Sequence, residues 1–209
     1  MRAGRWAQAV AVLAGTVLLH EIAHAIAARR VGGAVRELGV GFGPPLARRR
    51  VCGVNVSLRP LPLGGFAAIE VEKLPPALRL PVLLAAPLTN IAVGLGLRMI
   101  ARPTRPATLP GQMRPLEVGG VLAALAMLRG AAGRGPATLA RAAGDLNLSV
   151  GLANLLPLLP LDGGHLAAAQ LEAAGASPAA VHAFRQLSLA LFASLALRVV
   201  VADLGRLAR

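Results

Sequence analysis

Two histidines lie four residues apart in the sequence His20-Glu21-Ile22-Ala23-His24. On a helix, side chains with this spacing share a face, so both imidazoles can bind one metal ion. Zinc is the ion that such a pair typically holds, and the glutamate beside the first histidine is placed to act on a metal-bound water. The residue types and their spacing therefore predict hydrolytic chemistry at a single zinc ion.

The composition of the chain indicates that this pattern lies in a membrane. Apolar residues make up 56% of the 209 residues, charged residues make up 15%, and the mean hydropathy is +0.65. Long apolar stretches with few charges are typical of membrane proteins. Two core histidines without a metal are the competing interpretation. It is disfavoured because an ionisable group inside a span costs at least ~2.5 kcal/mol and is usually functional.

We expect an all-α membrane protein that forms a single domain over residues 1–209, with about four transmembrane helices. The expected spans are residues 6–28, 78–100, 144–161 and 179–201. Residues 116–128 are apolar but too short to span comfortably, so they predict an interfacial or partly buried helix. The first run begins like a signal peptide, but it contains the histidine pair and lacks a convincing cleavage site, which favours a retained span.

A small β region is predicted between the first two spans. Val54, Val56 and Leu58 alternate with polar residues, and this period of two is typical of a strand. Clusters of glycine and proline on both sides predict turns. Residues 35–68 therefore predict a membrane-associated β-hairpin or small sheet.

A catalytic zinc ion usually has three protein ligands, so one is still missing. The candidates near the later spans are Asp145, Asp162, Glu172, His165 and His182. The first and third spans run in the same direction because one span separates them, so their C-terminal ends lie on the same side. The histidine pair lies in the C-terminal third of the first span, and Asp162 ends the third. Topology therefore favours Asp162 over Asp145, which lies at the opposite end of that span.

The residues around Asp162 predict irregular backbone. Pro157 and Pro160 each break a helix, and Gly163 and Gly164 give conformational freedom beside the acid. Irregular backbone at membrane depth is tolerated where it is buried or lines a wet cavity, which suits a hydrolytic site. Taken alone, Asp-Gly is equally compatible with a helix-ending turn.

Together these elements resemble the site-2 protease family of intramembrane zinc metallopeptidases. His20 to His24 match the HExxH element, and Leu161-Asp162-Gly163 match the LDG element. Asn154 stands eight residues before the acid, as in the family's N-x-x-P-x-x-x-L-D-G form. The Gly/Pro clusters at 39–44 and 62–66 are similar to the β region of bacterial members, and residues 86–90 are similar to the G-P-x-x-N stretch.

The resemblance implies that His20, His24 and Asp162 bind one zinc ion per chain and that Glu21 is the general base and acid.

The sequence departs from the family pattern in two places. Ala86 replaces the glycine expected before the proline, and the connector after the second span is too short for the PDZ domain of close bacterial relatives.

Further roles are also implied by the resemblance. Asn154 would hydrogen-bond the substrate backbone or the developing oxyanion. Asn90 is a candidate for substrate positioning, and an interhelical hydrogen bond is an equal alternative. The β region, residues 35–68, would offer an edge to an extended substrate. His165 is expected to be structural.

The expected activity is hydrolysis of peptide bonds in single-span membrane protein substrates within or near the lipid bilayer, as in regulated intramembrane proteolysis. By resemblance, membrane-anchored anti-sigma factors and remnant signal peptides are candidate substrates. One alternative is a catalytically inactive zinc-binding membrane scaffold, which the intact Glu21 argues against. A second alternative is a metal transporter. It has little support, because the predicted spans do not include the paired, inverted broken helices typical of transporters.

The charge distribution bears on partners and orientation. The net charge is +13, but the cations lie in gaps between apolar runs, so we expect no nucleic-acid partner. Nine arginines and lysines lie in residues 29–79, and the positive-inside rule places this side in the cytoplasm. We therefore expect a multi-pass protein of the cell membrane with its active site towards the cytoplasmic side.

Overall fold

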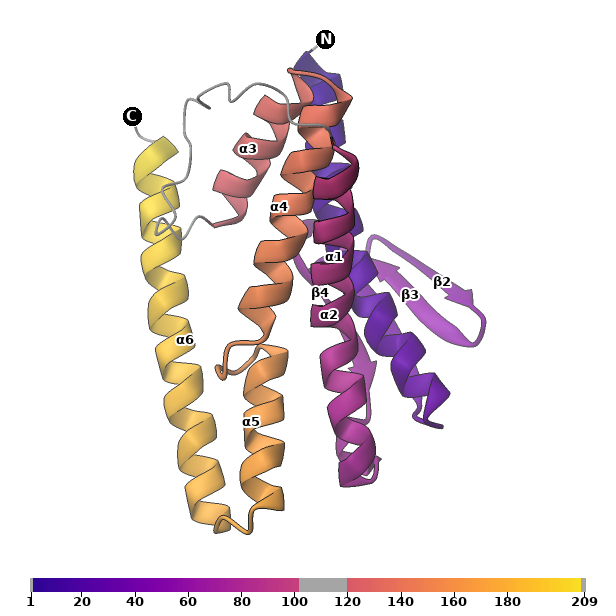
Figure 1. Ribbon diagram of the computed structural model, residues 1–209, viewed down its shortest axis with the longest axis vertical. Helices are drawn as coiled ribbons and strands as arrows, with labels where there is room; N and C mark the ends of the chain where they lie inside the picture. Colours follow the sequence, from indigo (N-terminus) through magenta and orange to yellow (C-terminus); the bar gives the residue numbers. More distant parts are fainter. Residues whose placement is uncertain (1, 102–119, 208–209) are drawn as a thin grey trace.

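The computed structural model describes residues 2–101 and 120–207 (Figure 1). It contains a mostly helical body with one small sheet and a short 3-10 turn, η1, after the sheet. In chain order the elements are α1 (Arg2–Arg30), β1 (Val35–Phe42), β2 (Ala47–Val51), β3 (Val54–Leu58), β4 (Leu61–Ile69), η1 (Val71–Lys73), α2 (Pro76–Ile100), α3 (Val121–Ala132), α4 (Pro136–Asn154), α5 (Asp162–Ala173) and α6 (Pro178–Leu207).

Three of the described helices are long and apolar enough to cross a membrane: Ala3–Arg30, Ala77–Ile100 and Pro178–Asp203. They contain the first, second and fourth predicted spans. The short helix predicted before the third span is α3, although residues 116–119 of that prediction lie outside the described residues. The segment between α2 and α3 is too short for a PDZ domain.

The predicted third span is wrong in its bounds. The predicted span covers residues 144–161, whereas α4 begins at Pro136 and ends at Asn154. The irregular chain from there to Leu161 confirms the irregular backbone predicted before Asp162. Pro157 and Pro160 account for this end, because proline lacks the N–H that a continuing helix needs. A new helix, α5, begins at Asp162, and no pattern in the sequence predicts it. The count of four spans is therefore not confirmed, since α4 is not among the three candidate spans.

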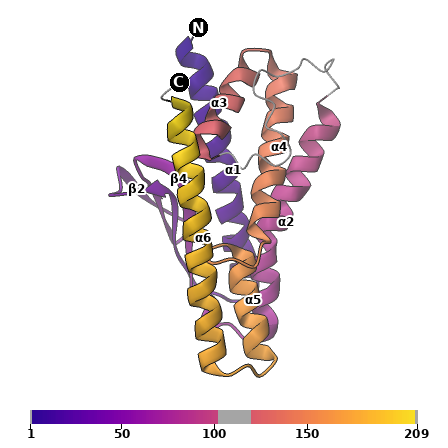
Figure 2. The ribbon, with the colours of Figure 1, turned by 90° about the vertical axis from the view of Figure 1, so that its left-hand side faces the viewer.

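Helices α4 and α5 follow one another along the long axis of the molecule, with the irregular segment between them (Figures 1 and 2). Helices α1 and α4 run in the same direction, as the topological argument required. The break between α4 and α5 lies far from both ends of the long axis. Asp162 is the first residue of α5 and follows this break directly, so the start of α5 lies away from both ends of the molecule.

The predicted β region is a four-stranded sheet in the order β2-β3-β1-β4, rather than a single hairpin. Strands β1 and β3 are parallel and the other pairs are antiparallel. The sheet packs against α1, where Ala25 meets Leu38 and Val54 in one apolar cluster. It lies on the side of α1 away from α6 (Figures 1 and 2).

Glycines bring the backbones of α2 and α4 close together. A Cβ atom on Gly94 would lie 2.9 Å from the carbonyl oxygen of Gly144, and one on Gly151 would lie 2.7 Å from that of Pro87. Small residues at helix contacts allow this approach in membrane proteins, where packing and interhelical hydrogen bonds hold helices together. Polar side chains on the facing surfaces of α2 and α4 can therefore reach one another directly.

Candidate metal centre

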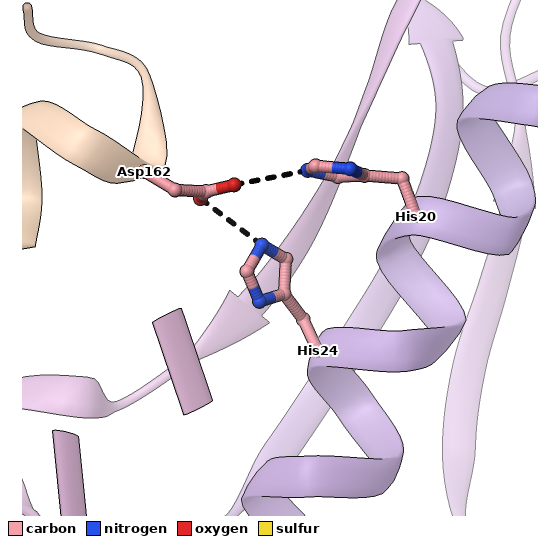
Figure 3. A group of neighbouring side chains, drawn as sticks. All are labelled: His20, His24 and Asp162. Atoms are coloured by element: carbon pink, nitrogen blue, oxygen red, sulfur yellow. Dashed lines mark hydrogen bonds and ion pairs between the residues drawn. The ribbon is translucent and has the colours of Figure 1, made fainter. Parts of the chain in front are cut away.

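Three of the predicted site residues converge at the break between α4 and α5. His20 and His24 project from one face of α1, and the Asp162 carboxylate points towards both rings (Figure 3). The Nε2 atom of His20 lies 3.1 Å from Asp162 Oδ2, and that of His24 lies 3.0 Å from Oδ1. One ligand atom from each residue lies within 4.8 Å of the other two. The helical spacing thus places both imidazoles beside a carboxylate 138 residues further along the chain.

The other nitrogen of each ring is engaged by an acceptor. His20 Nδ1 donates to Asn90 Oδ1 at 2.8 Å, and His24 Nδ1 donates to the carbonyl oxygen of Val82 at 2.8 Å. Because both Nδ1 atoms carry the proton, a neutral ring presents its Nε2 lone pair towards Asp162. Metal-binding histidines almost always have such a partner on the second nitrogen, which fixes the tautomer and the ring orientation.

The surroundings of Asp162 fit a bound cation. Its Oδ2 atom is buried and has no hydrogen-bond partner among residues 2–101 and 120–207, although His20 Nε2 is 3.1 Å away. Two imidazole lone pairs and a carboxylate facing one another repel unless a positive charge lies between them. Two histidine nitrogens and one carboxylate oxygen form a donor set that suits zinc and leaves a coordination position open. The group therefore fits a catalytic zinc ion.

Gly163 and Gly164 hold Asp162 in place through close packing. A Cβ atom on Gly163 would lie 2.4 Å from the carbonyl oxygens of Leu155 and Leu156, and one on Gly164 would lie 2.4 Å from the main chain at Leu158. Both glycines lie in the first turn of α5 with ordinary backbone angles. The prediction that they supply conformational freedom is therefore wrong, because they allow α5 to rest against the preceding segment.

Glu21 lies next to the histidine pair, with the edge strand β4 beside it. Glu21 is buried, with 8% of its surface exposed. A Cβ atom on Gly65 of β4 would lie 3.0 Å from Glu21 Cγ and 2.6 Å from a methyl carbon of Val17. Only a glycine lets this strand pass so close to α1. An extended peptide paired with β4 would consequently run near the glutamate.

The two predicted substrate-binding residues lie in different surroundings. Asn90 is fully buried and bonded to His20, so its contacts in the structure are interhelical. Asn154 is half-buried at the end of α4, and its amide donates to the Val150 carbonyl oxygen at 3.0 Å. A role in substrate binding stays a prediction for both.

The rejected ligand candidates lie elsewhere. Asp145 pairs with Arg98 at 2.7 Å, and Glu172 pairs with Arg185 at 2.9 Å. His165 and His182 are exposed. None of these four residues belongs to the three-residue group that could hold a metal ion.

Two buried polar residues near His20 have no role predicted from the sequence. Asn147 of α4 is 4% exposed, Thr16 of α1 is 3% exposed, and their side chains are hydrogen-bonded to each other at 3.0 Å. The available signal was an amide and a hydroxyl within apolar helices, because polar groups at membrane depth seek partners. Their partners could not be identified without the helix packing.

Comparison with known proteins identifies a family for this chain. Residues 8–197 match peptidase family M50. A membrane metalloprotease of Arabidopsis chloroplasts is 44% identical over 28% of this chain and 13% of its own length.

Two bacterial relatives carry names that propose a zinc metalloprotease. A Synechocystis protein is 42% identical over 29% of this chain and 16% of its own length, and a Neisseria meningitidis protein is 36% identical over 38% and 21%. The alignments thus span about a fifth or less of these relatives. Since the family match covers most of the residues, including every element of the metal centre, the chain belongs to peptidase family M50, the site-2 protease family.

Proposed function

We propose that this protein is an intramembrane zinc metalloprotease that hydrolyses peptide bonds of membrane-anchored substrates in or near the bilayer. The observation that carries the proposal is the convergence of His20, His24 and Asp162 on one point beside Glu21. The family match and the metalloprotease names of relatives support the same reaction class. The apolar helices around the site support its location in a membrane.

The residues divide the reaction between them. When bound, zinc supplies a Lewis acid that polarises the scissile carbonyl and acidifies water. His20, His24 and Asp162 would hold the ion. Glu21 takes a proton from the attacking water and passes it to the leaving amine. Asn154 would hydrogen-bond the substrate backbone or the developing oxyanion.

A peptide bond inside a helix is shielded by its own hydrogen bonds, so the substrate must unwind before it is cut. The sheet offers a strand to pair with such an extended segment. Strand β4 is an edge of the sheet and lies beside Glu21, which supports pairing at that edge.

The substrate class proposed is a single-span membrane protein cut by regulated intramembrane proteolysis. The proposed location is the cell membrane, with several passes and the active site towards the cytoplasmic side. The cationic residues of 29–79 support this orientation through the positive-inside rule.

The test uses the full chain purified in detergent, with bound zinc measured by elemental analysis and cleavage of a model single-span substrate followed by gel. We expect one zinc ion per chain and cleavage that is lost in Glu21→Gln. The matched control is Glu70→Gln, the same change at a carboxylate that pairs with Arg36 and Lys73. Unchanged cleavage by Glu21→Gln would refute the mechanism. Zinc binding without cleavage of any candidate would favour the inactive scaffold.

A further inference from the structure

A chain of buried hydrogen bonds links α4 to the first zinc ligand. Asn147 Nδ2 donates to the Ala143 carbonyl oxygen at 2.9 Å and to Thr16 Oγ1 at 3.0 Å. Asn147 Oδ1 accepts from Asn90 Nδ2 at 2.9 Å, and Asn90 Oδ1 accepts from His20 Nδ1 at 2.8 Å. The chain therefore passes from a main-chain carbonyl on α4 through two amides to an imidazole on α1.

The direction of every bond in this chain follows from its first member. A main-chain carbonyl can only accept, so the Asn147 nitrogen must face Ala143 and its oxygen must face Asn90. That oxygen in turn requires the nitrogen of Asn90, and the oxygen of Asn90 then faces His20. A second carbonyl, that of Thr16, lies 3.4 Å from the same Asn90 nitrogen and favours the same orientation.

We propose that Asn147 and Asn90 form a relay that orients His20 and keeps its Nε2 atom as the zinc-binding nitrogen. Asn147 acts as a positioning residue, because its side chain is hydrogen-bonded to Asn90 and Thr16 and reaches His20 through Asn90. A reversed Asn90 amide would point an N–H at His20 Nδ1. The ring would then carry its proton on Nε2, where it cannot bind a metal.

The surroundings of the relay keep it from being replaced by water or by other partners. Asn90 is 0% exposed, Asn147 is 4% exposed and Thr16 is 3% exposed. The close approach of α2 and α4 at Gly94 and Gly151 brackets the two amides. In a buried site an amide left with the wrong group facing its neighbour has a large cost, so one orientation dominates.

The inference rests on the zinc site of the proposed function but not on proteolysis, so the main measurement is zinc affinity of the full chain in detergent by chelator competition. Removing a partner of a metal-bound histidine typically lowers metal affinity 10- to 100-fold. We expect a loss in this range for Asn90→Leu and for Asn147→Leu. Ser149→Ala is the control on α4, because its hydroxyl bonds only to its own helix at Asp145 and is exposed.

A second pair of variants separates orientation from packing. Asn90→Asp presents an oxygen to His20 whichever way the side chain turns, so it should retain more zinc affinity than Asn90→Leu. For the same reason, adding Asn147→Leu to Asn90→Asp should cause no further loss. Nitrogen-15 NMR of the imidazoles in zinc-free protein should show the His20 proton on Nδ1 in the native chain and a mixture of tautomers in Asn147→Leu.

Two outcomes would overturn the relay: native zinc affinity in Asn147→Leu, or an equal loss from Asn147→Leu in the native and Asn90→Asp backgrounds. Should Asn147→Leu not remain monodisperse, Asn147→Ala replaces it in the same comparison, since it adds no bulk. If the native chain binds zinc through the relay but cleaves nothing, the proposed proteolysis fails and the relay stands. If the native chain binds no zinc, both fail.

Discussion

A single methyl group at Gly163 tests whether the packing of α5 positions Asp162. Ordinary contacts of a Cβ atom begin at 3.4 Å, whereas a Cβ on Gly163 would lie 2.4 Å from two main-chain carbonyl oxygens, which is 1.0 Å too close to each. Both clashing atoms belong to backbone, so no side-chain rotation relieves them. Overpacking of this kind costs about 1–3 kcal/mol.

The clash can be relieved by moving the first turn of α5, which carries Asp162, by about 1 Å. Zinc–oxygen bonds vary by only ~0.2 Å around their usual length, so a shift of that size takes the carboxylate out of range. If the whole overpacking cost of about 1–3 kcal/mol is subtracted from the free energy of zinc binding, Gly163→Ala lowers zinc affinity about 5- to 150-fold.

The assay is chelator competition in detergent, together with the melting temperature of the zinc-free protein. Gly96→Ala on α2 is the control, because a Cβ atom there meets nothing within 4 Å. Gly163→Ala with the zinc affinity and melting temperature of the control would refute the reasoning. A lower melting temperature with native zinc affinity would show that α5 adjusts without moving Asp162.

Three other perturbations have expected outcomes. Chelation should lower the melting temperature, because it leaves Asp162 facing two imidazole lone pairs; an unchanged value would contradict a bound ion. A hydrogen bond from Ser57 holds the pKa of Glu37 below its usual 4.5, so the stability of the protein should fall as the pH drops below 4.5. Thermal unfolding measured against pH should show a smaller fall in Glu37→Gln. Gly94→Val should cost about 1–3 kcal/mol of stability in denaturant titrations, since its Cβ would lie 2.8 Å from the main chain of α4, and equal stability would be inconsistent with this helix contact.

The histidine pair could be predicted from the sequence because its geometry is local. Four residues of helix place His20 and His24 on one face whatever the rest of the chain does. Asp162 could be predicted as their partner because parallel passes end on the same side. The structure places it beside both rings, although it opens α5 rather than ending a span.

Features that depend on contact between distant backbones could not be predicted. The glycines after Asp162 suggested conformational freedom of the backbone, whereas their role is to leave room for carbonyl groups of the preceding segment. The path of that irregular segment follows no sequence periodicity, so it could not be predicted. Helix α5 is not predicted, because an acid followed by Gly163 and Gly164 suggests a turn with conformational freedom rather than the start of a helix. The partners of Asn147 depend on the spacing of α1, α2 and α4, which a single sequence does not give.

The two imidazoles differ in how open they are to evolutionary change. His24 is held by the main chain of Val82, and every residue type that can sit in that helix supplies the same oxygen. His20 is held by a side chain, which one nucleotide change can remove. Substitution of Asn90 can therefore change how His20 binds the metal, while the hydrogen bond to His24 stays constant. Evolutionary changes in metal preference should accordingly begin around His20.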